Sequence, residues 1–400
     1  MNWKILTMKQ KIKKLLFYGA WLLKYSLLTV IFLIVTIPLR FSKKYKNLWL
    51  ISERPDEARD NGYWLYKWIL ENHPETNVRY VLSRKSTDYA KMPRKDLIVT
   101  PNSPMHYICH ILSSYSVSTH MHGACPGKSF CIPFLPFMRK KKTIFLQHGI
   151  TKNAINLRGR MDAIIAASEQ EKATIVKANP RYQNKIYVAV FCLYDFLKDE
   201  SKGEKEKIIL IMPTFRKWLR DIGRLKNSKD VFRDTDYCKN WQSFLNSEEI
   251  SQILKENQMQ IIFCPHKEMQ ELCQSITSEN KRIKISKPGE FDVQELLKKS
   301  SILITDYSSV FYDFVYMDKP VIFYQFDSEE FYSKHYQSSG EPYPFGSTFA
   351  TAEDVVRELG IIVESGVKIQ KKYKEEIMAF YKYRDCSNCK RVFNLIKELK

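Results

Sequence analysis

Short apolar runs alternate with longer amphipathic stretches along the chain after residue 46. The runs have the length of strands, and the stretches between them, such as 62–72 and 169–178, carry apolar residues at helical spacing. This alternation is typical of an α/β protein with parallel sheets. We expect strands at 48–51, 79–82, 97–100, 115–118, 143–147, 163–167, 186–190, 208–212, 260–264, 282–285, 301–305 and 321–324.

The polar stretch 198–207 has no apolar period and divides this pattern into two halves. It therefore has the character of a linker between domains. We expect two Rossmann-like domains, 47–200 and 201–400, with a cleft between them where ligands lie outside the carboxyl ends of the strands. The long, charged and weakly periodic segment 216–236 is expected to be a mobile loop near that cleft.

The first 46 residues differ from the rest because 15–39 are almost wholly apolar. This segment is long enough to cross a bilayer. Basic residues on both sides fit a single crossing poorly, whereas a helix lying on an anionic inner leaflet accommodates them without that conflict. We expect 1–46 to be a membrane-associated helical segment, peripheral or single-span, with the domains in the cytoplasm. A signal peptide is disfavoured because 40–43 offer no small-residue cleavage site.

The chain carries 64 Lys and Arg against 44 Asp and Glu, a formal charge of +20. Such a charge attracts an anionic partner, which can be a phosphorylated substrate, an acidic membrane surface or nucleic acid. No nucleic acid is expected, because aromatic and basic residues are not interleaved along one recognisable binding module. The nine cysteines have no repeated spacing and indicate reduced thiols in the cytosol rather than a disulfide framework.

Two histidines stand directly after predicted strands, one in each half of the chain. His148 and Gly149 follow strand 143–147, where the glycine permits a turn and the close approach of a ligand. His266 follows strand 260–264 and, when protonated, can donate charge-assisted hydrogen bonds to phosphate. Each could instead be a structural or solvated residue. One histidine in each domain favours a shared site in the cleft.

The second half carries further polar residues at strand ends. Segment 305–309, with the sequence TDYSS, lies between a strand and a helix and offers hydroxyl and free N–H groups to an anion. Asp306 or Ser308 could be merely a helix cap, but capping does not account for the whole polar run. The other candidates for donor binding are Thr305, Ser309, Thr214, Arg216 and Glu330.

The loop 119–123, with the sequence THMHG, also follows a predicted strand. His120 and His122 could bind a metal through alternate histidines, but no third ligand is recognisable. We expect no metal site, and the loop could instead face an acceptor.

Several of these segments together resemble the CDP-glycerol glycerophosphotransferase family of teichoic-acid and capsule synthesis. The resemblance covers roughly 47–395 and includes ER at 53–54 and ARDNGY at 58–63. Its other segments are QHG at 147–149, PTFR at 213–216, PH at 265–266, LITDYSSVFYDF at 303–314 and PVIFYQFD at 320–327. The chain departs from the family's pattern with QHGIT at 147–151 in place of WHGTP, and with Lys267 in place of proline.

The resemblance implies a GT-B fold, attachment to the inner face of a bacterial membrane, and a reaction without a metal or other cofactor. It implies transfer of a polyol phosphate from CDP-glycerol or CDP-ribitol to a hydroxyl of a lipid-linked or polymeric acceptor, with release of CMP. It also implies that His148 is the general base. The implied contacts to the donor pyrophosphate are His266, Thr305, Ser308 and Ser309, followed by Asp306 and Arg216.

Two other functions fit parts of the sequence. One is a sugar transferase of the same architecture that uses a nucleotide sugar. The other is a basic membrane or nucleic-acid binding protein without catalysis, which the positive charge alone would support. Glycerol and ribitol both stay open as the polyol, because no identified residue measures its length.

Overall fold

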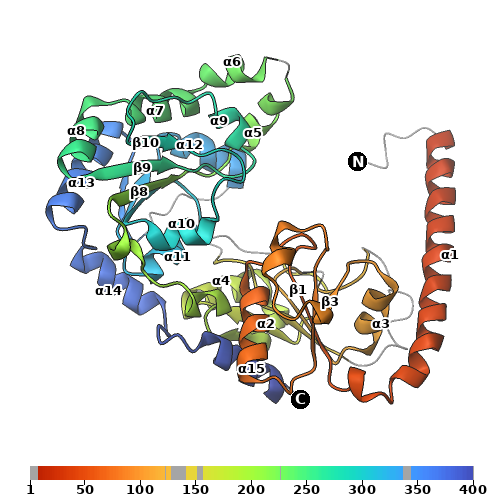
Figure 1. Ribbon diagram of the computed structural model, residues 1–400. Coiled ribbons are helices and arrows are strands. Elements are labelled where there is room, and N and C mark those ends of the chain that lie inside the picture. Colours follow the sequence, from red (N-terminus) through yellow and green to blue (C-terminus); the bar gives the residue numbers. More distant parts are fainter. Residues whose placement is uncertain are drawn as a thin grey trace.

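The computed structural model describes residues 8–121, 123–127, 141–150, 156–225, 227–336 and 344–399. These residues form two parallel sheets, one from each half of the chain (Figure 1). The first sheet has seven strands in the order β3-β2-β1-β4-β5-β6-β7, and the second has six in the order β10-β9-β8-β11-β12-β13. The predicted α/β fold with two parallel sheets is confirmed.

The first sheet and its helices alternate along the chain as the apolar pattern predicts. Their bounds are β1 Trp49–Ser52, α2 Asn61–Asn72, β2 Val78–Val81, β3 Ile98–Val99, α3 Pro104–Leu112, β4 Tyr115–Ser118, β5 Lys142–Phe145, β6 Ala163–Ala166, α4 Glu169–Ala178 and β7 Ile186–Val188.

The second sheet begins after the polar linker. Its strands are β8 Lys207–Met212, β9 Met259–Phe263, β10 Ile283–Ile285, β11 Ile302–Thr305, β12 Val321–Tyr324 and β13 Ser347–Phe349. The helices of this half are α5 Lys217–Arg220, α6 Ser228–Arg233, α7 Asp236–Leu245, α8 Glu248–Glu256, α9 Gln270–Cys273, α10 Val293–Lys299, α11 Val310–Tyr316, α12 Ser328–Phe331, α13 Ala352–Glu364, α14 Lys371–Phe380 and α15 Asn388–Glu398.

Burial on both faces explains why the strands are almost continuously apolar. Every residue of β1, β6, β11 and β12 is buried, as expected of parallel strands covered by helices on both sides. Several helices begin at a hydroxyl that accepts a backbone N–H of the first turn. Ser103 begins α3, Ser168 begins α4 and Thr351 begins α13 in this way.

The two halves are joined by buried contacts as well as by the linker. The Tyr194 hydroxyl, from the first half, donates to Asp313 Oδ1 of α11 at 2.7 Å. Helix α15 follows the second sheet in sequence but packs on the first half, where its Phe393 ring lies 5.3 Å from that of Trp49. The division into 47–200 and 201–400 stays a prediction, and α15 is a segment that crosses it.

Segment 216–236, expected to be a mobile loop, contains the short helices α5 and α6. The side chains of Leu219 and Phe232 are buried in the hydrophobic core of the second half. The apolar residues of this segment fall in short stretches separated by charged residues and do not produce a sustained helical period, which is why the sequence pattern missed these helices.

Helix α1, Met8–Leu39, runs along one edge of the molecule and packs on α3 (Figure 1). The rings of Phe32 and Tyr107 stack there with their centroids 4.8 Å apart. Many apolar side chains of α1 face solvent, among them Leu23 at 75% and Leu27 at 61% exposure. Among the residues that the structure describes, no helix has the length and apolar character needed to span a membrane.

Candidate active site

The carboxyl edge of the first sheet carries Arg54 after β1, His120 after β4 and His148 after β5. Strand β4 lies between β1 and β5, so these loops are neighbours at one edge of the sheet. The rings of His120 and His148 are stacked, with centroids 5.5 Å apart and planes at 12°. The His148 side chain and the half-buried Gly149 both reach solvent. His122 lies outside the described residues.

Gln147 turns the chain so that His148 leaves the sheet edge. Its φ of +59° is in the left-handed region, which is unfavourable for a residue other than glycine. The Gln147 side chain donates to the carbonyl of Ile165 at 2.7 Å, and its own carbonyl accepts from Asn61 at 2.9 Å. These buried hydrogen bonds hold the strained turn that presents the imidazole.

The pKa of His148 is lowered from its usual 6.5, first by desolvation from the surrounding protein and then by the positive charge of Arg54. The pKa of His266 is also lowered, mainly by desolvation, and Lys267 and Arg54 lower it further against the opposing effect of Glu268. Arg54 thus lowers the pKa of one histidine from each half. A lowered pKa favours the neutral imidazole at neutral pH, which is the form that can accept a proton.

The loop 305–309 splits into a buried part and an accessible part. Thr305 and Asp306 are fully buried, and the Thr305 hydroxyl donates to the carbonyl of Met212 at 2.6 Å. Ser308 is half-buried and Ser309 is exposed. The Ser308 hydroxyl accepts one long hydrogen bond of 3.4 Å from the N–H of Val310. Ser308 therefore caps helix α11 only weakly. Helix α11 has only seven residues, so the two serine hydroxyls are the stronger candidates for binding an anion.

Arg216 does not reach the surface. Its guanidinium is 0% exposed and lies 2.9 Å from Asp306 Oδ2 and 2.6 Å from Asp327 Oδ2. It also donates to the Thr214 carbonyl at 2.7 Å. Burial alone would lower the pKa of Arg216, but the charges of the two aspartates outweigh burial and raise it. This buried network ties together the ends of β8, β11 and β12, and we infer that Arg216 and Asp306 support the loop 305–309 from beneath.

Thr214 and His266 stand at the ends of β8 and β9, which are adjacent strands. Thr214 is buried, and its N–H donates to Asp306 Oδ1 at 2.8 Å. The His266 ring is exposed and lies 5.0 Å from the ring of Phe215, centroid to centroid. Of these predicted site residues, His266 is the one that can meet a ligand directly in this structure.

A pocket of about 910 Å³ lies against residues 326–330, which follow β12. Asp327 connects this pocket with the loop 305–309, because it lines the pocket and also accepts a hydrogen bond of 3.1 Å from the Tyr307 hydroxyl. Glu330 lies in the pocket wall, 2.7 Å from the ammonium of Lys334. Trp218 and Asn240 also line the pocket. Among the described residues, no group of three or more His, Cys, Asp or Glu side chains is arranged to hold a metal ion.

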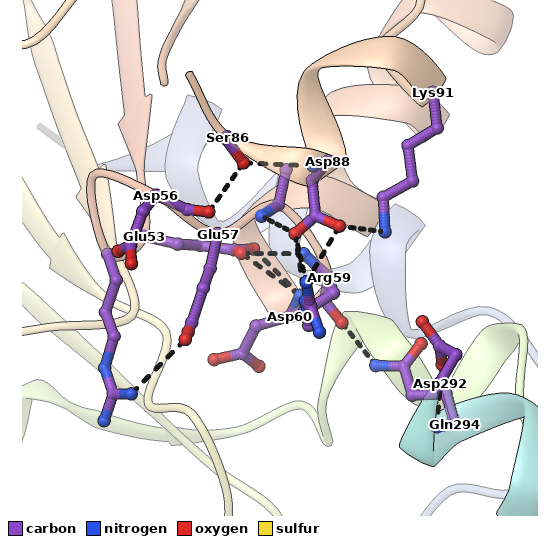
Figure 2. A network of polar contacts seen from close by, with 12 residues as sticks. Glu53, Asp56, Glu57, Arg59, Asp60, Ser86, Asp88, Lys91, Asp292 and Gln294 are labelled. Carbon is purple, nitrogen blue, oxygen red and sulfur yellow. Dashed lines mark hydrogen bonds and ion pairs between the residues drawn. The ribbon is translucent and has the colours of Figure 1, made fainter. Parts of the chain in front are cut away.

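The loop between β1 and α2, residues 53–60, meets the second half. Glu57 Oε1 lies 3.6 Å from Lys267 Nζ, and the Gln294 side-chain amide donates to the carbonyl of Arg59. Figure 2 shows Arg59 between Asp88 of its own half and Gln294. These contacts bring together loops from the carboxyl edges of the two sheets, where His148 and His266 also lie.

Comparison with known families matches residues 33–398 to the family described as CDP-Glycerol:Poly(glycerophosphate) glycerophosphotransferase. The chain belongs to this family. The resemblance read from the strand-end segments is therefore confirmed, over nearly the whole of the chain.

Two relatives from the genus Bacillus are named for teichoic-acid synthesis. The chain is 29% identical over 370 residues to the minor teichoic acid biosynthesis protein GgaB of Bacillus subtilis (strain 168), a match that covers 88% of this chain and 40% of that protein. A segment of 43 residues is 44% identical to the teichoic acid glycerol-phosphate primase of Bacillus spizizenii (strain ATCC 23059 / NRRL B-14472 / W23), 11% of each protein. The chain therefore spans well under two thirds of these relatives.

Solved structures show the same fold. The wall teichoic acid polymerase TagF, in its H548A variant, superposes with a TM-score of 0.66 at 17% identity and 98% coverage of both chains. A putative UDP-N-acetylglucosamine 2-epimerase from Listeria monocytogenes gives a TM-score of 0.54 at 13% identity, covering 88% of this chain and 96% of that chain. These likenesses support the two-sheet architecture alone.

Three residues of this candidate site were given no role by the sequence: Arg54, Glu57 and Lys267. Arg54 follows β1 just as His148 follows β5, so the rule that drew attention to strand ends could have found it. Lys267 follows His266 at the end of β9 and could have been found by the same rule, but Glu57 carried no such signal, and the meeting of Glu57 with Lys267 depends on how the halves are packed.

Proposed function

We propose that the chain transfers glycerol phosphate from CDP-glycerol to a hydroxyl group of a membrane-linked acceptor in teichoic-acid or related polymer synthesis. The observation that carries this proposal is family membership over 33–398, together with accessible His148, His266, Ser308 and Ser309 at the strand ends that meet between the halves. GgaB and TagF are named for teichoic-acid synthesis, and TagF has been solved after soaking with CDPG.

In the proposed reaction the acceptor oxygen attacks the β-phosphorus of CDP-glycerol. A new P–O bond forms to the acceptor, the P–O bond to CMP breaks, and the acceptor's proton passes to His148. His148 suits this role because its lowered pKa keeps the imidazole neutral at neutral pH. Removal of a general base typically costs about 10²–10⁴-fold in rate.

The donor phosphates are proposed to lie against Ser308, Ser309 and His266. Their hydroxyl and imidazole groups can donate to the leaving CMP phosphate, where charge grows as the bond breaks. Thr305, Asp306, Thr214 and Arg216 then act on the donor indirectly, by holding the serine loop, because they are buried.

The pocket beside this loop is proposed to receive the cytidine. The half-buried Trp218 offers a ring for stacking on the base, and Asn240 and Glu330 offer polar groups to ribose hydroxyls. Binding of CMP should then quench tryptophan fluorescence in the wild type. A Trp218→Phe variant, which keeps a ring for stacking, should bind CMP but lose most of that signal.

Helix α1 is proposed to attach the protein peripherally to an anionic membrane. Its exposed leucines supply apolar area, and the exposed Lys43 and Lys44, a few residues after the helix, supply positive charge. Flotation with phosphatidylglycerol vesicles should fall in a Leu23→Glu, Leu27→Glu variant. An Ile361→Glu variant is the control, because that side chain is 50% exposed on α13 in the other half.

A donor screen tests the function. Purified protein is mixed with membranes and with CDP-glycerol, CDP-ribitol, or UDP- and GDP-sugars, and the free nucleotide is measured. We expect CMP from CDP-glycerol in the wild type and at least about 100-fold less in His148→Ala. Release from a nucleotide sugar alone would instead identify a glycosyltransferase. Full activity in His148→Ala would reject the assigned base.

A further inference from the structure

Two cations from opposite halves of the molecule converge on the carboxylate of Glu57. Arg54 Nη1 lies 3.4 Å and Lys267 Nζ lies 3.6 Å from Glu57 Oε1. Both cations reach solvent, with 46% of the Arg54 side chain and 62% of the Lys267 side chain exposed. The Glu57 carboxylate is therefore an anion held by cations from both halves. Contacts of this length are weak enough for another anion to replace it.

The loop that presents Arg54 and Glu57 is fixed from beneath. Buried Glu53 accepts N–H bonds from Arg59 at 3.0 Å, Asp60 at 3.1 Å and Tyr63 at 2.6 Å. Buried Asp88 accepts two hydrogen bonds of 2.9 Å from the Arg59 guanidinium. Figure 2 shows these carboxylates around the loop. Arg54 therefore starts from a prearranged backbone, as a group that binds substrate requires.

Arg54 has N–H donors that its contact with Glu57 does not use. A guanidinium carries five N–H donors, and in the described part of the chain the contact with Glu57 is a single hydrogen bond of 3.4 Å. Arginine binds phosphate through paired, charge-assisted hydrogen bonds, whereas lysine acts as a point charge. The contacts with the single Glu57 carboxylate therefore leave N–H donors that the several oxygens of a phosphate group can accept from.

We propose that Arg54 and Lys267 clamp one phosphate group of a substrate between the two halves. In the absence of that phosphate, the Glu57 carboxylate binds the two cations in its place. This inference rests on the proposed function, since it assigns phosphate recognition at the same site. The position fits the chemistry, because the Arg54 charge already acts on both His148 and His266, the proposed base and donor contact.

The clamped phosphate can come from the donor's diphosphate or from the phosphate of a polymeric acceptor, and the experiment separates the two. Full-length Arg54→Gln, Lys267→Gln and the double variant are compared with wild type. Calorimetric titration with CDP-glycerol alone forms the donor arm. The KM for a glycerol-phosphate oligomer at saturating CDP-glycerol forms the acceptor arm.

Arg54→Gln is expected to weaken one arm about 10-fold or more, the loss typical of removing one charge-assisted hydrogen bond. Lys267→Gln should weaken the same arm, and the double variant should lose less than the product of the two single losses, because both cations hold one group. Arg54→Lys should recover part of the loss. Glu57→Gln should bind at least as tightly as wild type, since it removes a competing carboxylate.

The matched control is Arg94→Gln, which breaks an exposed ion pair with Asp96 (2.8 Å, both side chains 60% exposed) in the same half. Thermal melting of each variant checks folding. The clamp is overturned if the wild type turns over CDP-glycerol but Arg54→Gln matches Arg94→Gln in both arms. It is also overturned if Glu57→Gln binds more weakly than wild type. Absence of CMP release in the wild type would instead reject the proposed function.

Discussion

Replacement of Arg216 by methionine is expected to destabilise the protein severely. The side chain is fully buried and lies between the carboxylates of Asp306 and Asp327, at 2.9 and 2.6 Å. Methionine retains much of the volume but leaves two buried acids without their cation. Removal of one partner from a buried ion pair typically costs about 3–5 kcal/mol. We expect a loss of this size in the free energy of unfolding.

The measurement is equilibrium unfolding in urea, followed by circular dichroism and tryptophan fluorescence. Arg220→Met is the control, because Arg220 forms an exposed pair with Glu268 at 3.4 Å, and exposed pairs contribute about 0–1 kcal/mol. Asp327→Asn should cost less than Arg216→Met, because it leaves one arginine opposite one aspartate rather than two uncompensated acids.

An Arg216→Met variant as stable as Arg220→Met would refute this electrostatic reasoning. If that stable variant also bound CDP-glycerol more weakly, the guanidinium would be a direct contact to the donor, as the sequence alone predicts. Unfolding and donor titration on the same preparation therefore distinguish a supporting role from a binding role.

Three further predictions concern protons and hydroxyls. Burial raises the pKa of Glu53 from 4.5 to about 7 despite its backbone hydrogen bonds. The folded state therefore holds an extra proton between these values, and this contribution to stability is lost as pH rises through about 7. Urea unfolding at about pH 5 and about pH 8 should show a smaller difference for Glu53→Gln than for wild type. Because the pKa of His148 is lowered, CMP release should decline only below its usual 6.5, and a midpoint above that value in the pH profile would contradict the assignment. Ser308→Ala and Ser309→Ala should each raise the KM for CDP-glycerol about 3- to 10-fold with unchanged melting, whereas Thr305→Val should lower the melting temperature, since its hydroxyl serves the Met212 carbonyl.

The sequence predicted the sheets well because parallel strands are buried on both faces and so appear as apolar runs. It also located accessible candidate site residues, since the residues after such runs gather at one edge of a sheet. His148, His266 and Ser309 were found in this way, and all three side chains reach solvent. The strand β13 was missed, because the side chains of its three residues are only partly buried or exposed and give no apolar run.

Partners far apart in the chain account for what the sequence could not show. Arg216 follows a strand as a ligand-binding residue would, but the two aspartates that enclose it come from loops after β11 and β12. Likewise, Glu57 and Lys267 meet only because the two halves pack together. Local spacing determines where a side chain leaves a sheet, whereas burial and ion pairing depend on contacts that spacing does not encode.

Helix α15 follows the second sheet in sequence, but its side chains complete the packing of the first half. Phe393 covers Trp49 and lies 4.2 Å from the ring of His73, and Asp195 accepts N–H bonds of 2.8 Å from Asn388 and Cys389. A fragment cut at the linker would expose these aromatic rings to water and leave the Asp195 carboxylate without its donors. Supplying residues 381–399 as a separate peptide should therefore restore such a fragment, in the manner of a split protein.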